Sequence, residues 1–157
     1  MNNLKKVRKV GEGVFGEVFV GQFGTARKAR IFKIVAIEGR KLVNDQVQRK
    51  FEQIESEIIV SQYLNKLYYG YNGCYTEGFV YMHNARICQG KYPQKLIRAW
   101  NSYKKHHHCE NDKPDYCRTQ LYAVFEYDFC GIDICSFHFT TFKQSLAVIL
   151  QVKLIIA

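Results

Sequence analysis

The sequence lacks the features that mark disordered, repetitive or membrane-spanning proteins. Its 157 residues contain only two prolines, no low-complexity tract and no internal repeat. The longest apolar run, residues 146–157, is interrupted by Gln151 and Lys153 and is shorter than the roughly 20 residues that cross a bilayer. Because 47% of the residues are hydrophobic and 15% are aromatic, we expect a packed core and no membrane partner.

Signatures of secretion and of zinc binding are also missing. The first ten residues, MNNLKKVRKV, have no apolar core and so do not resemble a signal peptide. The six cysteines form no C-x-x-C pair, and the three histidines at 106–108 have no second pair of ligands at metal-binding spacing. These patterns predict an intracellular protein with reduced thiols, and a polar histidine loop rather than a zinc site.

Acidic residues are scarce relative to basic ones. Asp and Glu number 14 against 23 Lys and Arg, which gives a net charge of +9. A basic surface attracts phosphate groups on nucleotides, nucleic acids or anionic lipids. The charges are scattered rather than grouped into blocks, which is more typical of a solubilising surface. A basic nucleic-acid-binding protein is therefore an alternative that charge alone supports.

Five segments favour β-strands. Residues 7–23 read as two strands joined by a glycine turn, and residues 29–37, 79–88 and 121–127 are rich in β-branched and aromatic side chains. This pattern predicts a twisted antiparallel sheet of about five strands, the commonest sheet size.

Three further segments favour helices, at residues 44–67, 93–105 and 144–157. In the first, Asn44 or Asp45 could act as the N-cap. Its apolar side chains recur at helical spacing, at Val47, Phe51, Ile54 and Ile58. We therefore predict an α+β fold in which the 44–67 helix packs on the sheet, with a polar loop at 104–119 and a helical tail at the end.

The glycine-rich segment GEGVFGEVF, residues 11–19, carries the first functional signal. A dinucleotide-binding G-x-G-x-x-G motif needs a helix directly after it, whereas here the following residues favour a strand. A glycine turn between two strands, with valine two residues after the last glycine, matches the form found in protein kinases. The alternative is a glycine hairpin that binds no ligand.

Lys33 and Glu57 strengthen the kinase interpretation. A kinase places a lysine on its third strand to hold the α- and β-phosphates of ATP, and a glutamate on the next helix steadies that lysine. Lys33 lies in the middle of the apolar segment 29–37, and Glu57 lies beside the apolar face of the 44–67 helix. The alternative, two unrelated surface charges, does not explain why loop, lysine and glutamate follow one another in this order.

Eight segments together resemble protein kinases of the haspin type. They are GEGVFGEVF, KIVAIEG, LVN, EIIVS, TEGF, CQGKYP, RAW and GID. The resemblance runs from about residue 4 to about residue 135. It implies a kinase N-lobe over residues 1–127, followed by the hinge and the start of the C-lobe over residues 128–157.

The resemblance implies an ATP site. Its residues would be Val10, Gly11, Glu12, Gly13, Val14, Phe15, Gly16, Val18, Ile31, Lys33, Glu57, Tyr127, Asp128, Cys130 and Asp133. The three glycines would line the phosphates and Val18 would pack on the adenine. Tyr127 would be the gatekeeper, the backbone of Asp128 and Cys130 would face the adenine edge, and Asp133 would accept from the ribose hydroxyls.

Two residues depart from the family pattern at the adenine. Ile31 stands where kinases usually carry a small alanine, and an added branched side chain in a packed pocket costs about 1–3 kcal/mol if nothing adjusts. Cys130 stands in the hinge where haspins usually carry glycine, although its backbone could still form a hydrogen bond.

The largest departure is the absence of the catalytic motifs. The 157 residues contain no H-R-D-type loop, no D-F-G and no D-Y-T. Phosphoryl transfer needs the aspartate that accepts the hydroxyl proton and the side chains that hold Mg²⁺. We therefore expect that this polypeptide alone is inactive, with no catalytic residue and no Mg²⁺ ligand of its own.

The resemblance also implies partners and a location. Haspin-type kinases use ATP to phosphorylate a threonine of a histone tail, which implies a chromatin partner and a nuclear location. The alternative is a truncated pseudokinase that binds ATP or docks a protein partner. Such a partner would cover the apolar tail, residues 146–157, which we expect to be exposed.

Overall fold

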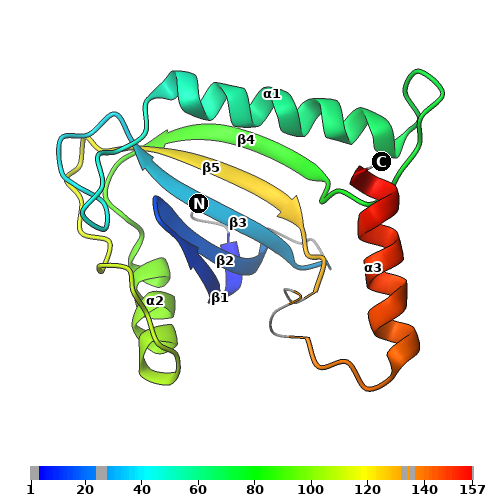
Figure 1. Cartoon of the computed structure of the whole chain (residues 1–157). Helices are drawn as coiled ribbons and strands as arrows, with labels where there is room; N and C mark the ends of the chain where they lie inside the picture. The colour runs from blue at the N-terminus through cyan, green and yellow to red at the C-terminus, as the bar shows by residue number, and fades with distance from the viewer. Residues whose placement is uncertain (1–3, 24–27, 132–133, 135–136, 157) are drawn as a thin grey trace.

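The computed structural model describes residues 4–23, 28–131, 134 and 137–156 (Figure 1). The elements follow the expected order of three strands, a helix, a strand, a helix, a strand and a helix. The strands are β1 (Leu4–Gly13), β2 (Gly16–Phe23), β3 (Arg30–Ile37), β4 (Met82–Gln89) and β5 (Leu121–Asp128). The helices are α1 (Phe51–Tyr68), α2 (Gln94–His106) and α3 (Phe142–Ile156). The predicted α+β architecture is confirmed.

The five strands form one antiparallel sheet in the order β1-β2-β3-β5-β4. β3 lies at its centre because its apolar run can be buried on both faces. Its neighbour β5 pairs with it along its whole length, which places Lys33 opposite Phe125. β1 and β4 are the edges of the sheet. The pairing register of β1 shifts twice, between Lys5 and Arg8 and between Lys9 and Gly11, and that of β4 shifts between Met82 and Asn84.

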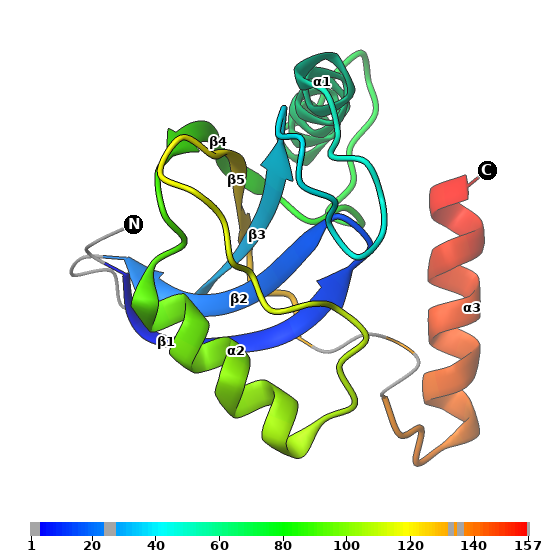
Figure 2. The same ribbon diagram turned by 90° about the vertical axis from the view of Figure 1, so that its left-hand side faces the viewer.

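Each face of the sheet carries its own core. Successive side chains of a strand point to opposite faces. On one face, Phe32 and Ile34 of β3 join a cluster with Leu96 of α2. On the other face, Val35 joins a cluster with Ile54 of α1. Figure 2 shows the consequence, with α1 and α2 on different sides of the sheet.

The first helix begins later than the sequence predicted. The residues from Asn44 to Lys50 are not helical, and Val47 is 71% exposed instead of lying on the apolar face. Asn44 and Asp45 both have positive φ, and the backbones of Val43 and Gln46 exchange two hydrogen bonds of 2.9 Å across this turn. Two consecutive left-handed residues cannot open a right-handed helix, so neither Asn44 nor Asp45 is its cap.

Helix α1 is held at both ends by polar contacts. At its start the Phe51 N–H donates to the Glu38 carboxylate at 2.6 Å, and Lys50 pairs with the same carboxylate at 3.2 Å. These bonds lower the pKa of Glu38, the Phe51 N–H most of all. Near its end the Asn65 side chain donates to the Met82 carbonyl at 2.7 Å and accepts from the Met82 N–H at 2.9 Å. Both anchors fix the helix relative to the sheet.

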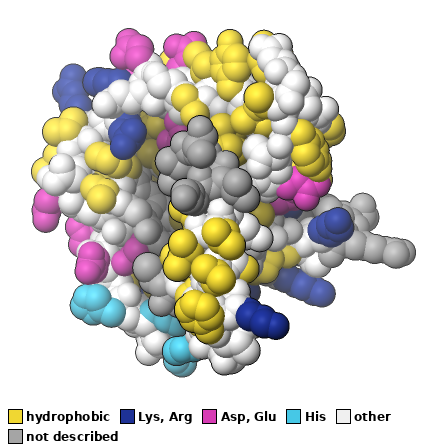
Figure 3. All heavy atoms as spheres, turned by 45° about the vertical axis from the view of Figure 1, so that its right-hand side comes forward, with side chains coloured by type: hydrophobic (Ala, Val, Ile, Leu, Met, Phe, Trp, Pro, Cys, Tyr) yellow, Lys and Arg dark blue, Asp and Glu magenta, His cyan; other side chains and the backbone are white. Residues whose placement is uncertain are grey.

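Helix α3 stands apart from the sheet (Figures 1 and 2). Its apolar side chains are exposed, with Phe142 at 79% and Ile149 at 63%. Figure 3 shows yellow apolar side chains gathered on the forward face, the side that carries α3 in Figure 1. In the part of the chain that the structure describes, no helix is both long and apolar enough to cross a membrane.

Candidate nucleotide site

The ion pair expected from the sequence is present at the centre of the sheet. Lys33 Nζ lies 2.6 Å from Glu57 Oε1, which joins β3 to α1. Tyr127, which pairs with Ile31 across the sheet, directs its hydroxyl toward the same Glu57 oxygen at 3.5 Å. The Lys33 ammonium also lies 5.4 Å from the centre of the Phe125 ring. Lys33 remains 37% exposed, so its ammonium is both oriented and accessible.

A cavity of about 420 Å³ opens between this ion pair and the glycine turn. Among the predicted site residues it brings together eight, Glu12, Gly13, Val14, Phe15, Gly16, Val18, Lys33 and Glu57. Val35 and Arg49 complete its lining. The cavity therefore combines the backbone of a glycine turn with the Lys33 ammonium of β3. Both are groups that bind the phosphates of a nucleotide in protein kinases.

Two glycines of the turn, Gly13 and Gly16, differ in whether the folded protein leaves room for a side chain. A Cβ on Gly16 would lie 2.1 Å from the Ile34 carbonyl oxygen, so strand pairing alone requires glycine there. A Cβ on Gly13 would meet no protein atom within 4 Å, and Gly13 does not have positive φ. Neither packing nor backbone conformation explains glycine at 13. The open space beside it fits a ligand that approaches the backbone closely.

Arg49 is a cavity residue that the sequence interpretation missed. Its guanidinium lies 4.4 Å from the centre of the Phe15 ring, at the tip of the glycine turn. Within the described part of the chain, no carboxylate pairs with Arg49, whereas Lys33 is paired with Glu57. The sequence pattern of residues 44–67 predicts a helix that includes Arg49. In the structure Arg49 lies in the loop before α1, which is why its place in the cavity was not predicted.

Of the residues predicted to surround the adenine, Val18 lines this cavity, whereas Val10, Ile31, Tyr127, Asp128 and Cys130 do not. Gly11, which was predicted to line the phosphates, does not line it either, and Asp133 lies outside the described residues. Ile31 is half-buried between Val20 and Tyr127 in the sheet. Asp128 is bonded to His83 of β4 at 2.6 Å. Their adenine-binding roles remain predictions.

Glu12 lines the cavity, but partners from other elements hold its carboxylate. Lys9 pairs with it, the Cys109 thiol donates to it at 2.9 Å and the Glu110 N–H donates to it at 2.7 Å. Burial would raise the pKa of Glu12, but these hydrogen bonds outweigh it and lower the pKa from 4.5 to about 2. The carboxylate therefore stays charged and engaged within the protein.

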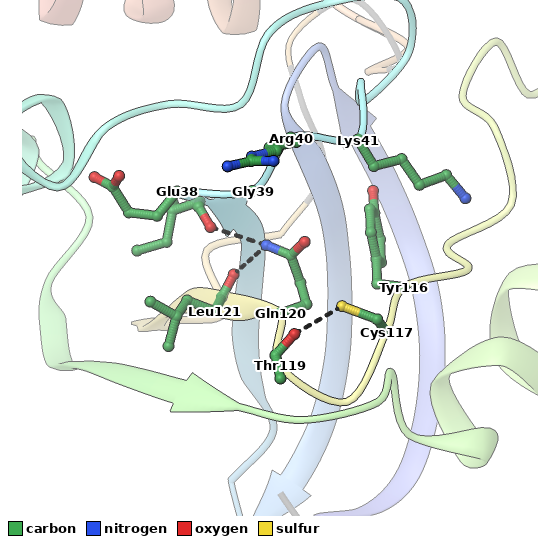
Figure 4. Close-up of a pocket in the computed structure, with 10 residues that line it drawn as sticks. Glu38, Gly39, Arg40, Lys41, Tyr116, Cys117, Thr119, Gln120 and Leu121 are labelled. Atoms are coloured by element: carbon green, nitrogen blue, oxygen red, sulfur yellow. Dashed lines mark hydrogen bonds between the residues drawn. The ribbon is translucent and has the colours of Figure 1, made fainter.

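A second cavity, of about 380 Å³, lies between the end of β3 and the start of β5 (Figure 4). The Gln120 amide points between the carbonyls of Ile37 and Leu121, at 2.9 and 2.8 Å, and also pairs with Gln48. Neither the glycine turn of residues 13–16 nor Lys33 lines this cavity, and the Glu38 carboxylate at its edge pairs with Lys50. Among the residues that the structure describes, no three His, Cys, Asp or Glu side chains gather as a metal site requires.

Comparison with known proteins agrees with this arrangement. The family described as "Haspin like kinase domain" matches residues 1–157. The serine/threonine-protein kinase haspin of Bos taurus is 44% identical over 133 residues, which cover 83% of this chain and 16% of that protein. The haspin homolog of Drosophila melanogaster is 33% identical over 162 residues, which cover 99% of this chain and 28% of that protein.

The chain thus spans only a minor part of the length of these relatives, 16% of the bovine protein and 28% of the fly protein. Within that part the match extends over the glycine turn, the Lys33–Glu57 pair and the sheet that positions them. The chain belongs to the haspin-like family of serine/threonine protein kinases.

Proposed function

We propose that this chain forms the ATP-binding lobe of a haspin-type serine/threonine protein kinase. The observation that carries the proposal is the Lys33–Glu57 ion pair at the cavity beneath the glycine turn. A lysine held in this way offers its ammonium to the α- and β-phosphates of ATP. A role as a purely structural ion pair would not require an open cavity of about 420 Å³ beside it.

The residues of the lobe act by binding and orientation. Bound ATP would supply the γ-phosphoryl group that a protein kinase transfers. Lys33 would neutralise phosphate charge while Glu57 fixes the direction of its side chain. The glycine turn would let backbone N–H groups approach the phosphates without side chains between them. Tyr127, beside Glu57, would limit the depth of the site.

The finer family properties are part of the same proposal. The substrate would be a threonine of a histone tail, which implies a nuclear location. Mg²⁺ would accompany ATP, and no residue of these 157 is assigned to hold it. Since the sequence contains no H-R-D, D-F-G or D-Y-T motif, this polypeptide alone would transfer no phosphate.

Thermal shift with ATP tests the proposal. Millimolar ATP should raise the midpoint of unfolding of the 157-residue chain, because a ligand that binds only the folded state stabilises it. Lys33→Met should abolish that rise. Lys105→Met is the control, because it removes an exposed lysine of α2 that does not line the cavity. An equal ATP response in wild type and Lys33→Met would contradict the proposal.

A second function is favoured by the exposed apolar surface of α3. We propose that a protein partner covers this helix, since exposed apolar patches of this kind mark interaction sites. Sedimentation with and without Ile149→Asp would test it, because the polar variant should lose any association of the chain. A monomeric wild type would show that the partner is not a second copy of the chain, and no ATP response would contradict the first function.

A further inference from the structure

A short segment between α2 and β5, residues 109–112, lies against the outside of the glycine turn. We call this segment the strap. Its Asn111 is only 7% exposed, and the side-chain amide donates to the carbonyls of Gly13 and Gly16 at 3.1 and 3.3 Å. The same nitrogen lies 2.9 Å from the Glu17 carboxylate, so the two amide N–H groups are shared among three acceptors. A side chain some 95 residues away thus holds both ends of the turn.

Asn44 holds the tip of the turn from a neighbouring loop. Its amide donates to the Val14 carbonyl at 2.8 Å, and its side-chain oxygen accepts from the Asp112 N–H at 2.8 Å. Asn44 therefore links the strap to the tip. Together the two asparagines bind the carbonyls of Gly13, Val14 and Gly16.

Binding these carbonyls also sets the direction of backbone N–H groups. In a planar trans peptide the C=O and the following N–H point in opposite directions. With the carbonyls of Gly13 and Val14 turned toward the asparagines, the N–H groups of Val14 and Phe15 point the other way. Successive residues of β2 point to opposite faces, and Glu17 contacts the strap while Val18 lines the cavity. These N–H groups therefore point to the cavity side.

The base of the strap is anchored in a buried polar cluster. The Lys9 side chain is completely buried, pairs with Glu12, and lies 2.6 Å from Glu17 Oε2. It also donates to the Cys109 thiol at 3.4 Å. Removing one member would leave another buried charge without its partner, which is costly. These contacts hold residues 109 and 110 of the strap in place against β1.

We propose that Asn111 and Asn44 are positioning residues that aim the N–H groups of Val14 and Phe15 at the phosphates of a bound nucleotide. The inference rests on the proposed ATP binding but adds a cause for the shape of the turn. It predicts that the strap matters for phosphates and not for the adenosine part of the ligand.

The test compares ATP with adenosine, which lacks phosphates. Asn111→Ala should weaken ATP binding about tenfold, the equivalent of one or two net hydrogen bonds, and leave adenosine binding unchanged. The matched control is Asn101→Ala, an exposed asparagine of α2, which should bind both ligands like the wild type. Titration calorimetry of the wild type and the two variants with each ligand gives the six affinities.

Asn44→Gly guards against misfolding, because Asn44 is less buried than Asn111 and glycine accepts its positive φ. It should show the same selective loss of ATP affinity, with faster hydrogen exchange at Val14 and Phe15. Equal losses for ATP and adenosine, or unchanged ATP binding in both folded variants, would overturn the strap proposal alone. If the wild type bound neither ligand, the proposed function would fail. The positioning role has its own test in that case: hydrogen exchange at Val14 and Phe15 that Asn44→Gly leaves unchanged would refute it.

Discussion

At the scale of single residues, two glycines of the same turn are glycine for different physical reasons. Gly16 is required by the approach of the Ile34 carbonyl, whereas Gly13 borders open space. The sequence shows the same letter at both positions, so the spacing predicted the turn but not this difference. The contact between Gly16 and β3 depends on strand pairing, which becomes visible only in the folded chain.

Two alanine variants should therefore behave differently. Gly16→Ala should lower the free energy of unfolding by about 2–4 kcal/mol, because the new Cβ forces β2 away from β3. Gly13→Ala should change stability little but weaken ATP binding, because its Cβ enters the space beside the cavity. Urea unfolding and ATP titration measure the two effects. Equal stability of the two variants would contradict this distinction.

Arg49 supports a second prediction at this scale. An unpaired guanidinium in the cavity should form a charge-assisted hydrogen bond to a phosphate, so Arg49→Ala should weaken ATP binding about tenfold. Arg40→Ala is the control, because this exposed arginine lines the other cavity. If both variants bound ATP like wild type, Arg49 would have no part in phosphate binding.

At the scale of elements, the sequence predicted every strand and helix in order. Its largest error is the start of α1, and the starts of β1 and β4 differ by three residues from the predicted ones. The spacing of apolar residues predicts α1, and the side chains of Asn44 and Asp45 suit the N-cap of a helix. Their positive φ values serve a turn instead, and the real N-terminal partner is Glu38, which precedes the helix by 13 residues. The strap contacts were equally hidden, since no local pattern relates Asn111 to Gly13.

The anchoring of α1 predicts a link between Asn65 and the Lys33–Glu57 pair. Asn65→Ala removes two hydrogen bonds to Met82 and should destabilise the fold by about 1–2 kcal/mol. Because α1 carries Glu57, ATP affinity should fall as well, although Asn65 does not line the cavity. Gln62→Ala, on the exposed side of the same helix, should leave both unchanged. Chemical unfolding and calorimetry would show whether the two losses occur together.

At the scale of the whole molecule, the charges around the strap make stability depend on pH. The pKa of Glu12 is lowered from 4.5 to about 2 in the folded chain. A lowered carboxyl pKa stabilises the folded state above pH 4.5, and this contribution is lost as the pH falls toward 2. Burial raises the pKa of Glu17, which acts in the opposite direction.

Comparison with Glu12→Gln tests the Glu12 contribution. The wild type should lose more free energy of unfolding between pH 5 and pH 2.5 than this variant. Glu12→Gln also removes a negative charge that helps to raise the pKa of Glu17, so the difference reports the Glu12 contribution together with its effect on Glu17. Urea unfolding across this pH range is the measurement. Parallel pH profiles of the two proteins would show that the Glu12 carboxylate is not held as the structure indicates.

The edges of the sheet have a consequence for how copies of the chain can meet. β1 presents exposed Lys5, Lys6 and Arg8, and its pairing register shifts between Lys5 and Arg8, where Lys6 has positive φ. Clustered positive charge and a kinked backbone both discourage strand-by-strand growth between molecules. Self-association through the β1 edge is therefore disfavoured. If copies of the chain meet through the exposed apolar face of α3 instead, a single polar substitution there should reduce the turbidity of concentrated protein while the β-sheet remains intact.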